Sequence, residues 1–224
     1  MIIIIRGHIR NSFKDNQLYN LIKYLSNNYN IDIYIHTWSI KQNNISWRNL
    51  ENDFTIIDEN YIYNYFTDLV KFIRKIIIDD ESKILAEFDD KQKILSTKTY
   101  LLGWKRYIYS KYSILNYVNK IIENKNNFVL NIRFDLFTNS YIFPFDEITN
   151  FIDNNYTNEF NKNKFLRVGE YCGIDNIYIG NITTNYNLVS YINFNLDEIL
   201  KYKENENLVH PEFIIFRINS KIFL

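Results

Sequence analysis

The sequence predicts a single α/β domain in which an open, Rossmann-type sheet is flanked by helices. Three observations support this prediction. Short apolar runs alternate with longer segments whose apolar residues recur at helical spacing, as in βαβ units around a parallel sheet. The first run is apolar at every position, as expected for a strand that is buried on both faces. The 224 residues fit one domain, and no linker rich in Gly, Pro or Ser divides them.

The first forty residues predict a strand, a helix and a second strand. The apolar run at residues 2–5 is followed by a loop that contains Gly7 and His8. Apolar residues then lie at helical spacing, at Leu18, Leu21, Ile22 and Leu25. Residues 31–35 form the second apolar run. This order is typical of the first unit of a parallel sheet.

The middle of the chain predicts a short strand at residues 56–57 and two helices. The first helix is expected over residues 61–78, where the apolar face consists of Tyr65, Leu69, Phe72, Ile73 and Ile76. The second covers residues 99–123, and the Asn-rich residues 124–127 are expected to end it.

A further buried strand is predicted at residues 128–132, and its carboxyl end carries Arg133 and Asp135. In open α/β sheets, ligands bind at this end of the strands. The last third of the chain contains strand-like runs at residues 165–168, 177–179 and 213–216 and a predicted helix near residues 196–202.

The composition excludes several classes of protein. Lys and Arg together number 26, as do Asp and Glu, so the chain lacks the positive field that nucleic acid requires. Cys172 is the single cysteine, which excludes an intrachain disulfide and suits a reducing compartment. No apolar segment reaches the roughly 18 residues that a membrane-spanning helix needs. We therefore expect a cytoplasmic protein with at most peripheral membrane contact.

The first candidate site segment follows the first strand and covers residues 6–10. Gly7 lets the backbone approach a ligand closely, and Arg10 can grip phosphate oxygens with its guanidinium fork. A tight turn with two surface arginines is the alternative. The segment lacks both the G-x-G-x-x-G and the P-loop patterns, so neither a dinucleotide fingerprint nor a P-loop NTPase is indicated.

The second candidate is the pair His36 and Trp38 at the end of the second strand. Trp38 can stack on a nucleotide base, although core packing is the commoner place for a tryptophan. His36 can serve a ligand or satisfy a local hydrogen bond.

The third candidate is the pair Arg133 and Asp135, which lie two residues apart at a strand end. One interpretation is a plain salt bridge. In the other, Asp135 binds a divalent cation, Mn²⁺ or Mg²⁺, while Arg133 steadies a diphosphate. One carboxylate is a poor site for such a cation, so waters and phosphate oxygens would complete it.

The fourth candidate is a glycine-containing loop at residues 169–180 that presents Asp175, either at a cleft or as the cap of a turn. His210 and Glu212 come later, at the start of the last apolar run. No local signature favours a cysteine hydrolase at Cys172, and closely spaced zinc ligands are absent from the sequence.

The order of these motifs resembles a family of bacterial and large-virus glycosyltransferases of polysaccharide and surface-glycan synthesis. The matching segments are Gly7 to Arg10, the strand Asp32 to Trp38, a Tyr-rich helix at Trp104 to Lys120, Arg133 to Asp135, the loop Gly173 to Gly180, and His210 to Glu212. They are collinear over nearly the whole chain.

The resemblance implies a GT-A-like fold with a nucleotide-sugar-binding half, residues 1–135, and an acceptor-side half, residues 136–224. It implies transfer of a sugar from a nucleoside-diphosphate donor to a hydroxyl group of a glycan or small acceptor. This sequence departs from the strict Asp-x-Asp motif, because Arg133 occupies the first position. Metal dependence is therefore open, since the arginine can replace part of a cation's charge.

The resemblance also implies roles for individual residues. Arg10 and Arg133, with Gly7 and His8, are expected at the nucleotide sugar, and His36 and Trp38 at the wall of its pocket. Asp135 is expected to bind the metal or the sugar. Asp175 is the candidate general base and Glu212 its rival.

Two other classes of protein fit the same sequence. One is a catalytically inactive nucleotide- or carbohydrate-binding module. The other is a structural virion or assembly protein whose abundant Tyr and Phe side chains form an interface.

Overall fold

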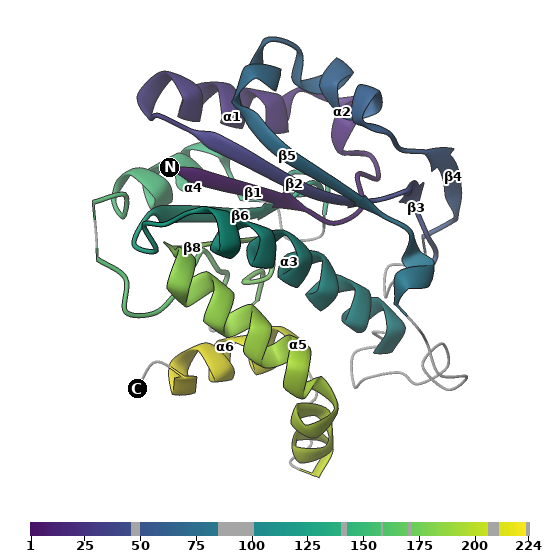
Figure 1. Ribbon diagram of the computed structural model, residues 1–224, viewed down its shortest axis with the longest axis vertical. Coiled ribbons are helices and arrows are strands. Elements are labelled where there is room, and N and C mark those ends of the chain that lie inside the picture. The colour runs from purple at the N-terminus through teal and green to yellow at the C-terminus, as the bar shows by residue number, and fades with distance from the viewer. Residues whose placement is uncertain are drawn as a thin grey trace.

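The computed structural model describes residues 1–45, 50–84, 101–139, 143–157, 159–169, 172–205 and 211–222. Within these ranges the chain forms one α/β domain around a six-stranded, mostly parallel sheet of order β5-β2-β1-β6-β8-β7 (Figure 1). Its strands are β1 (Ile2–Arg6), β2 (Asp32–Trp38), β5 (Ile73–Asp79), β6 (Phe128–Arg133), β7 (Lys164–Phe165) and β8 (Ile177–Asn181). The predicted fold class, an open sheet flanked by helices, is confirmed.

The order in which the chain adds strands to the sheet reverses beside β1. The chain proceeds outward from β1 to β2 and β5, and then returns to the other side of β1 to form β6. These four strands are parallel, whereas β8 is antiparallel to both β6 and β7. In open α/β sheets the point of reversal leaves a crevice at the carboxyl ends of the two strands. The crevice here lies between β1 and β6.

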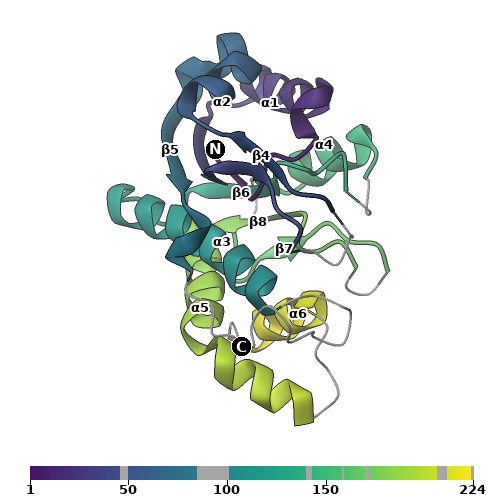
Figure 2. The same ribbon diagram turned by 90° about the vertical axis from the view of Figure 1, so that its right-hand side faces the viewer.

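Helices cover both faces of the sheet (Figures 1 and 2). The helices are α1 (Gln17–Asn28), α2 (Glu59–Phe66), α3 (Leu101–Ile121), α4 (Phe145–Asp153), α5 (Ile182–Asn205) and α6 (Pro211–Ile222). Ile3 and Ile5 of β1 pack with α1, α2 and α4, whereas Ile2 and Ile4 pack with α3 and α5. Burial on both faces explains why β1 is apolar at every position.

The predicted helix over residues 61–78 is wrong beyond its first turns. Helix α2 ends at Phe66, a 3-10 turn covers Thr67–Phe72, and β5 follows. Thr67 has a φ of 45°, a conformation that no α-helix continues through. The isoleucines after it are β-branched and pair in parallel with β2, so tertiary pairing overrides their helical spacing.

The strand predicted at residues 213–216 is also wrong, because this run lies inside α6. Ile214, Ile215 and Ile218 are buried at helical spacing in one cluster with residues of α5. The predicted helix near residues 196–202 is the second half of α5, which begins at Ile182.

The remaining predictions are confirmed in outline. Helix α3 matches the long predicted helix, and β6 matches the second buried strand. The short strand near residues 56–57 exists as β4 (Asp53–Ile56), but it pairs with β3 (Ile40–Gln42) in a separate two-stranded sheet. Among the described helices, none combines the length and apolarity that crossing a bilayer requires.

Candidate functional site

The candidate site lies where β1 and β6 end side by side. Arg6 and Arg133 are the last residues of these strands and are paired in register. After β1 the chain turns at Gly7, whose φ is 97° and whose N–H donates to the carbonyl of His36 over 3.1 Å. Glycine adopts this conformation without steric cost, so the turn brings the loop over the end of β2.

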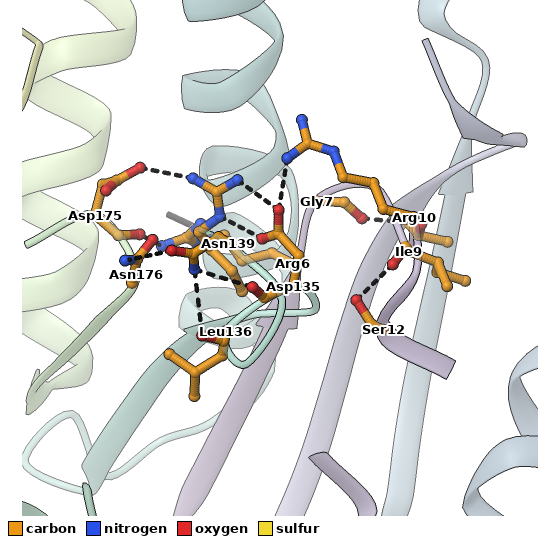
Figure 3. Close-up of polar contacts among 12 residues, drawn as sticks. Arg6, Gly7, Ile9, Arg10, Ser12, Asp135, Leu136, Asn139, Asp175 and Asn176 are labelled. Carbon is orange, nitrogen blue, oxygen red and sulfur yellow. Dashed lines mark hydrogen bonds and ion pairs between the residues drawn. The ribbon is translucent and has the colours of Figure 1, made fainter. Parts of the chain in front are cut away.

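The loop delivers Arg10 across the crevice, as Figure 3 shows. Arg10 has a φ of 53°, which is uncommon for a residue with a side chain and is typically found at functional sites. Its N–H donates to the carbonyl of Lys41 over 3.0 Å. Its Nη1 donates to Oδ2 of Asp135 over 2.5 Å.

Asp135 is held by two arginines and is 2% exposed. Besides Arg10, Arg133 donates from Nε to Oδ1 over 2.7 Å and from Nη2 to Oδ2 over 3.0 Å. Both carboxylate oxygens are therefore engaged by guanidinium groups. In the structure Arg133 and Asp135 therefore form a salt bridge, and Arg10 is an additional partner of Asp135.

This arrangement does not fit the predicted divalent cation at Asp135. In the described ranges no group of three or more His, Cys, Asp or Glu residues is placed to hold a metal ion. Mg²⁺ and Mn²⁺ favour carboxylate oxygens and water as ligands, and two adjacent guanidinium charges repel a cation.

Asp175 and Glu212, the rival candidates for a general base, lie against each other. Arg133 Nη1 donates to Oδ2 of Asp175 over 2.8 Å, and the N–H of Gly173 donates to Oε1 of Glu212 over 2.8 Å. The two carboxyl groups are themselves hydrogen-bonded. The pair belongs to one network with Arg133.

The two carboxyl groups share one proton at neutral pH. Burial, then the charge of Asp175, raises the pKa of Glu212 to about 9. Burial alone would raise the pKa of Asp175 too, but the Arg133 charge and the hydrogen bond from Glu212 bring it below its ordinary value. Glu212 therefore carries the proton, and Asp175 is ionised.

Two buried basic side chains, for which the sequence predicts no role, lie close to this network. Arg6 is 1% exposed, donates to Oδ1 of Asn131 over 2.8 Å and donates to the carbonyl of Asp175 over 2.5 Å. Lys111 of α3 lies 4.2 Å from the ring centre of Tyr107. Burial, assisted by the nearby Arg6 charge, places the pKa of Lys111 well below its ordinary value.

A second polar cluster joins the loop after β1 to α3. His8 Nε2 lies 2.6 Å from Oε1 of Glu81, which also accepts from Asn43, and Arg106 Nη1 lies 2.9 Å from Oε2 of Glu81. Burial lowers the pKa of His8, and the hydrogen bond with Glu81 only partly opposes this. Arg106 shares one face of α3 with other cavity residues, namely Gly103, Tyr107 and Ser110. That helical spacing is a signal that sequence reasoning overlooked.

His36 and Trp38 are core residues more than site residues. His36 is fully buried, and its Nε2 lies 3.2 Å from Oδ2 of Asp79. Trp38 is 1% exposed and stacks on Tyr109 at 5.9 Å. Trp38 borders the cavity, whereas His36 lies behind it in the core and pairs with Asp79.

The cavity at the crevice has a volume of about 70 Å³. Among the described residues, its lining includes four arginines, Arg6, Arg10, Arg106 and Arg133, and a single carboxylate, Asp135. Gly7 and His8 also line it. The lining is chemically suited to an anion.

Some of the predicted site residues lie outside the described ranges or next to their ends. His210 lies outside the described residues, and so do residues 170–171 of the glycine-containing loop. Cys172 is a free cysteine whose carbonyl accepts a 2.8 Å hydrogen bond from Val168.

Comparisons with known proteins give one finding. No family model matches the sequence, and no curated protein matches it. Among solved structures, the apo form of mouse xyloside xylosyltransferase 1 is similar over 97% of this chain and 80% of that chain, with 10% sequence identity and a TM-score of 0.38.

Proposed function

We propose that this protein is a glycosyltransferase that moves a sugar from a nucleoside-diphosphate donor to a hydroxyl group of a glycan or small acceptor. One observation carries the proposal: the point where the strand order reverses holds a cavity whose described lining residues include four arginines and one carboxylate. Guanidinium groups at this point suit the diphosphate of such a donor. The order of motifs along the chain supports the same activity.

In the proposed reaction, the bond between the sugar's anomeric carbon and the diphosphate oxygen breaks, and a bond from that carbon to the acceptor oxygen forms. Negative charge develops on the departing diphosphate, where Arg10 and Arg133 would stabilise it. In an inverting displacement the acceptor's proton passes to a carboxylate. Asp175 suits this role because it is ionised, whereas Glu212 already holds a proton.

The division of labour along the chain is part of the proposal. Residues 1–135 contribute β1, β6 and all four of these cavity arginines, and would hold the nucleotide sugar. Residues 136–224 contribute Asp175 and Glu212 and would form the acceptor side.

A thermal-shift screen tests the proposal with UDP, GDP, CMP and dTDP, each with and without manganese. A nucleotide at a hundredfold excess over its dissociation constant should stabilise the fold by about 2.7 kcal/mol. Arg10→Gln should abolish this shift, because it removes one of the two guanidinium groups proposed to bind the diphosphate. Arg133 still pairs with Asp135 in this variant, so the fold is preserved. The matched control is Arg74→Gln, which removes an exposed arginine that pairs with Asp32 on β2. If no nucleotide raises the melting temperature, the glycosyltransferase proposal fails.

The inactive binding module is the second candidate, and one observation favours it. The ionised carboxylate of Asp175 is already paired with Arg133, which weakens it as a base. Slow hydrolysis of the donor sugar in the absence of acceptor distinguishes the two candidates. A binding module would bind the nucleotide sugar and leave it intact.

A further inference from the structure

The Arg10–Asp135–Arg133 group has the form of an occupied anion site. Two guanidinium groups reach Asp135 from the ends of two different strands, and together they engage both of its oxygens. A phosphate group presents the same pair of oxygens to arginine forks. Figure 3 shows Arg10 and Asp175 on opposite sides of Asp135, which lies between them at the centre of the crevice.

The site also contains buried N–H donors that are available to a larger anion. In the part of the chain that the structure describes, Nε of Arg10 and Nε of Arg106 are buried and have no hydrogen-bond partner. A carboxylate has two oxygens, whereas a diphosphate offers several. A buried donor without a partner is unfavourable, so the site gains when a ligand satisfies it.

The lining of the cavity indicates where that ligand would lie. Asp135 is part of the lining and occupies the place at which a phosphate group would meet both Arg10 and Arg133. A diphosphate carries more negative charge than one carboxylate, so it attracts the two arginines more strongly.

We propose that Asp135 is the internal counter-anion of a metal-independent diphosphate site, and that a phosphate group of the ligand replaces it between Arg10 and Arg133. Asp135 then competes with the ligand, and the two arginines supply the positive charge that a cation supplies elsewhere. One part of this inference rests on the proposed function, namely that the bound diphosphate belongs to a nucleotide.

The two roles of Asp135 predict opposite effects of one isosteric substitution. If Asp135 is a counter-anion, Asp135→Asn removes a competing negative charge and strengthens metal-free diphosphate binding. If Asp135 is a metal ligand, the same change weakens binding that depends on the metal. Asn keeps the shape of Asp and one acceptor oxygen for the arginines.

Isothermal titration of the full chain with inorganic diphosphate, in EDTA and in manganese, measures the difference. We expect Asp135→Asn to bind diphosphate in EDTA roughly tenfold more tightly than the unmodified chain, the effect of removing one like charge beside the ligand. Manganese should raise the affinity for diphosphate of the variant and of the unmodified chain by less than about twofold. The control is Asp32→Asn, which removes the aspartate of the exposed pair with Arg74 and should leave the affinity unchanged.

A second variant keeps the test informative if Asp135→Asn does not fold. Arg10→Gln should lower the affinity for diphosphate in EDTA at least tenfold, and manganese should not restore it. Weaker binding by Asp135→Asn in EDTA, or recovery of Arg10→Gln by manganese, would overturn the inference.

The same titrations with UDP, GDP and dTDP separate this inference from the proposed function. If a nucleoside diphosphate binds only with manganese, the counter-anion inference fails and the glycosyltransferase proposal stands. If inorganic diphosphate binds as expected and no nucleoside diphosphate binds, the proposal fails and the inference stands. If neither class of ligand binds the chain under any condition, both fail.

Discussion

Glu212, which is buried, and Asp175, which is partly exposed, hold one proton between their carboxyl groups beside the guanidinium of Arg133. The folded chain keeps the proton on Glu212 up to a pKa of about 9, whereas the unfolded chain releases it near 4.5. Stability from this group is therefore complete below pH 4.5 and is lost as the pH rises toward 9. The lowered pKa of Asp175 acts in the opposite sense, and its contribution is lost only as the pH falls below 3.8.

Glu212→Gln should remove this pH dependence. Its amide can still accept from the N–H of Gly173 and donate to Asp175, so the contacts survive without a titrating proton. Between pH 5 and 9, the free energy of unfolding of the unmodified chain should fall relative to that of the variant, by at most about 1.4 kcal/mol per pH unit. Urea denaturation across this range measures the difference. Parallel pH profiles would show that Glu212 is ionised in the folded chain.

The sequence located most of these residues but not their roles. Arg10 and Asp135 stand out because charged residues follow predicted strands there, and Asp175 stands out because it lies in a glycine-containing loop before an apolar run. Whether Asp135 meets a cation or an arginine depends on Arg10, which lies 125 positions away, and no local pattern contains that information. Arg6 and Lys111 have no assigned role in the sequence analysis because a buried cation and a surface cation look alike in one sequence.

At the scale of single elements, Gly180 shows how β8 joins α5. A Cβ atom at this position would collide with the side chains of Asn163, Thr184 and Asn185, which form a buried amide and hydroxyl cluster. Glycine inside a strand commonly marks such a close approach.

Gly180→Ala should lower the free energy of unfolding by about 1–3 kcal/mol, because the cluster has no room for a methyl group. Gly103→Ala is the comparison, since its Cβ would meet one backbone oxygen, that of Ile45, at 3.1 Å and would gain helix propensity. Urea denaturation should show the larger loss at Gly180. Equal losses would mean that the cluster rearranges freely around the added methyl group.

The end of α2 gives another prediction at this scale. Thr67 has a φ of 45° and a ψ of −113°, a conformation that suits glycine and strains a residue with a Cβ. Thr67→Gly should therefore raise the free energy of unfolding by about 1 kcal/mol. Thr67→Ala loses the same hydroxyl, which donates to Asp68, but keeps the Cβ, and it should give no gain. A gain for both variants in urea denaturation would attribute the effect to the hydroxyl and not to the backbone.

The elements differ in how far the sequence alone predicts them. Strand β1 and helix α1 follow from an uninterrupted apolar run and a clear helical spacing. In β5 and α6, by contrast, the abundance of isoleucine satisfies helical and strand patterns at once. The choice is then made by neighbours, by β2 for the strand and by α5 for the helix, and these contacts are distant in sequence.

At the scale of the whole molecule, α6 ties the end of the chain to both the site and the sheet. Glu212 in its first turn reaches Gly173 and Asp175. Asn219, one turn before its end, accepts from the side chain of Asn163 over 3.0 Å and donates to its carbonyl over 3.0 Å. These contacts make α6 part of the same cooperative unit as the sheet, in accord with a single domain.

Asn219→Ala tests that cooperativity. The substitution leaves the N–H and carbonyl of Asn163 buried without these partners, so the free energy of unfolding should fall by about 2 kcal/mol. Circular dichroism of the helices and tryptophan fluorescence, to which Trp38 near β1 contributes, should shift together, because loss of the α6 contact destabilises the whole fold. The control is Ser220→Ala, the next residue, whose hydroxyl bonds only within α6 and should matter by less than about 0.5 kcal/mol. An early loss of helical signal with unchanged fluorescence would instead show that α6 unfolds by itself, and Glu212 would then leave Asp175 before the sheet opens.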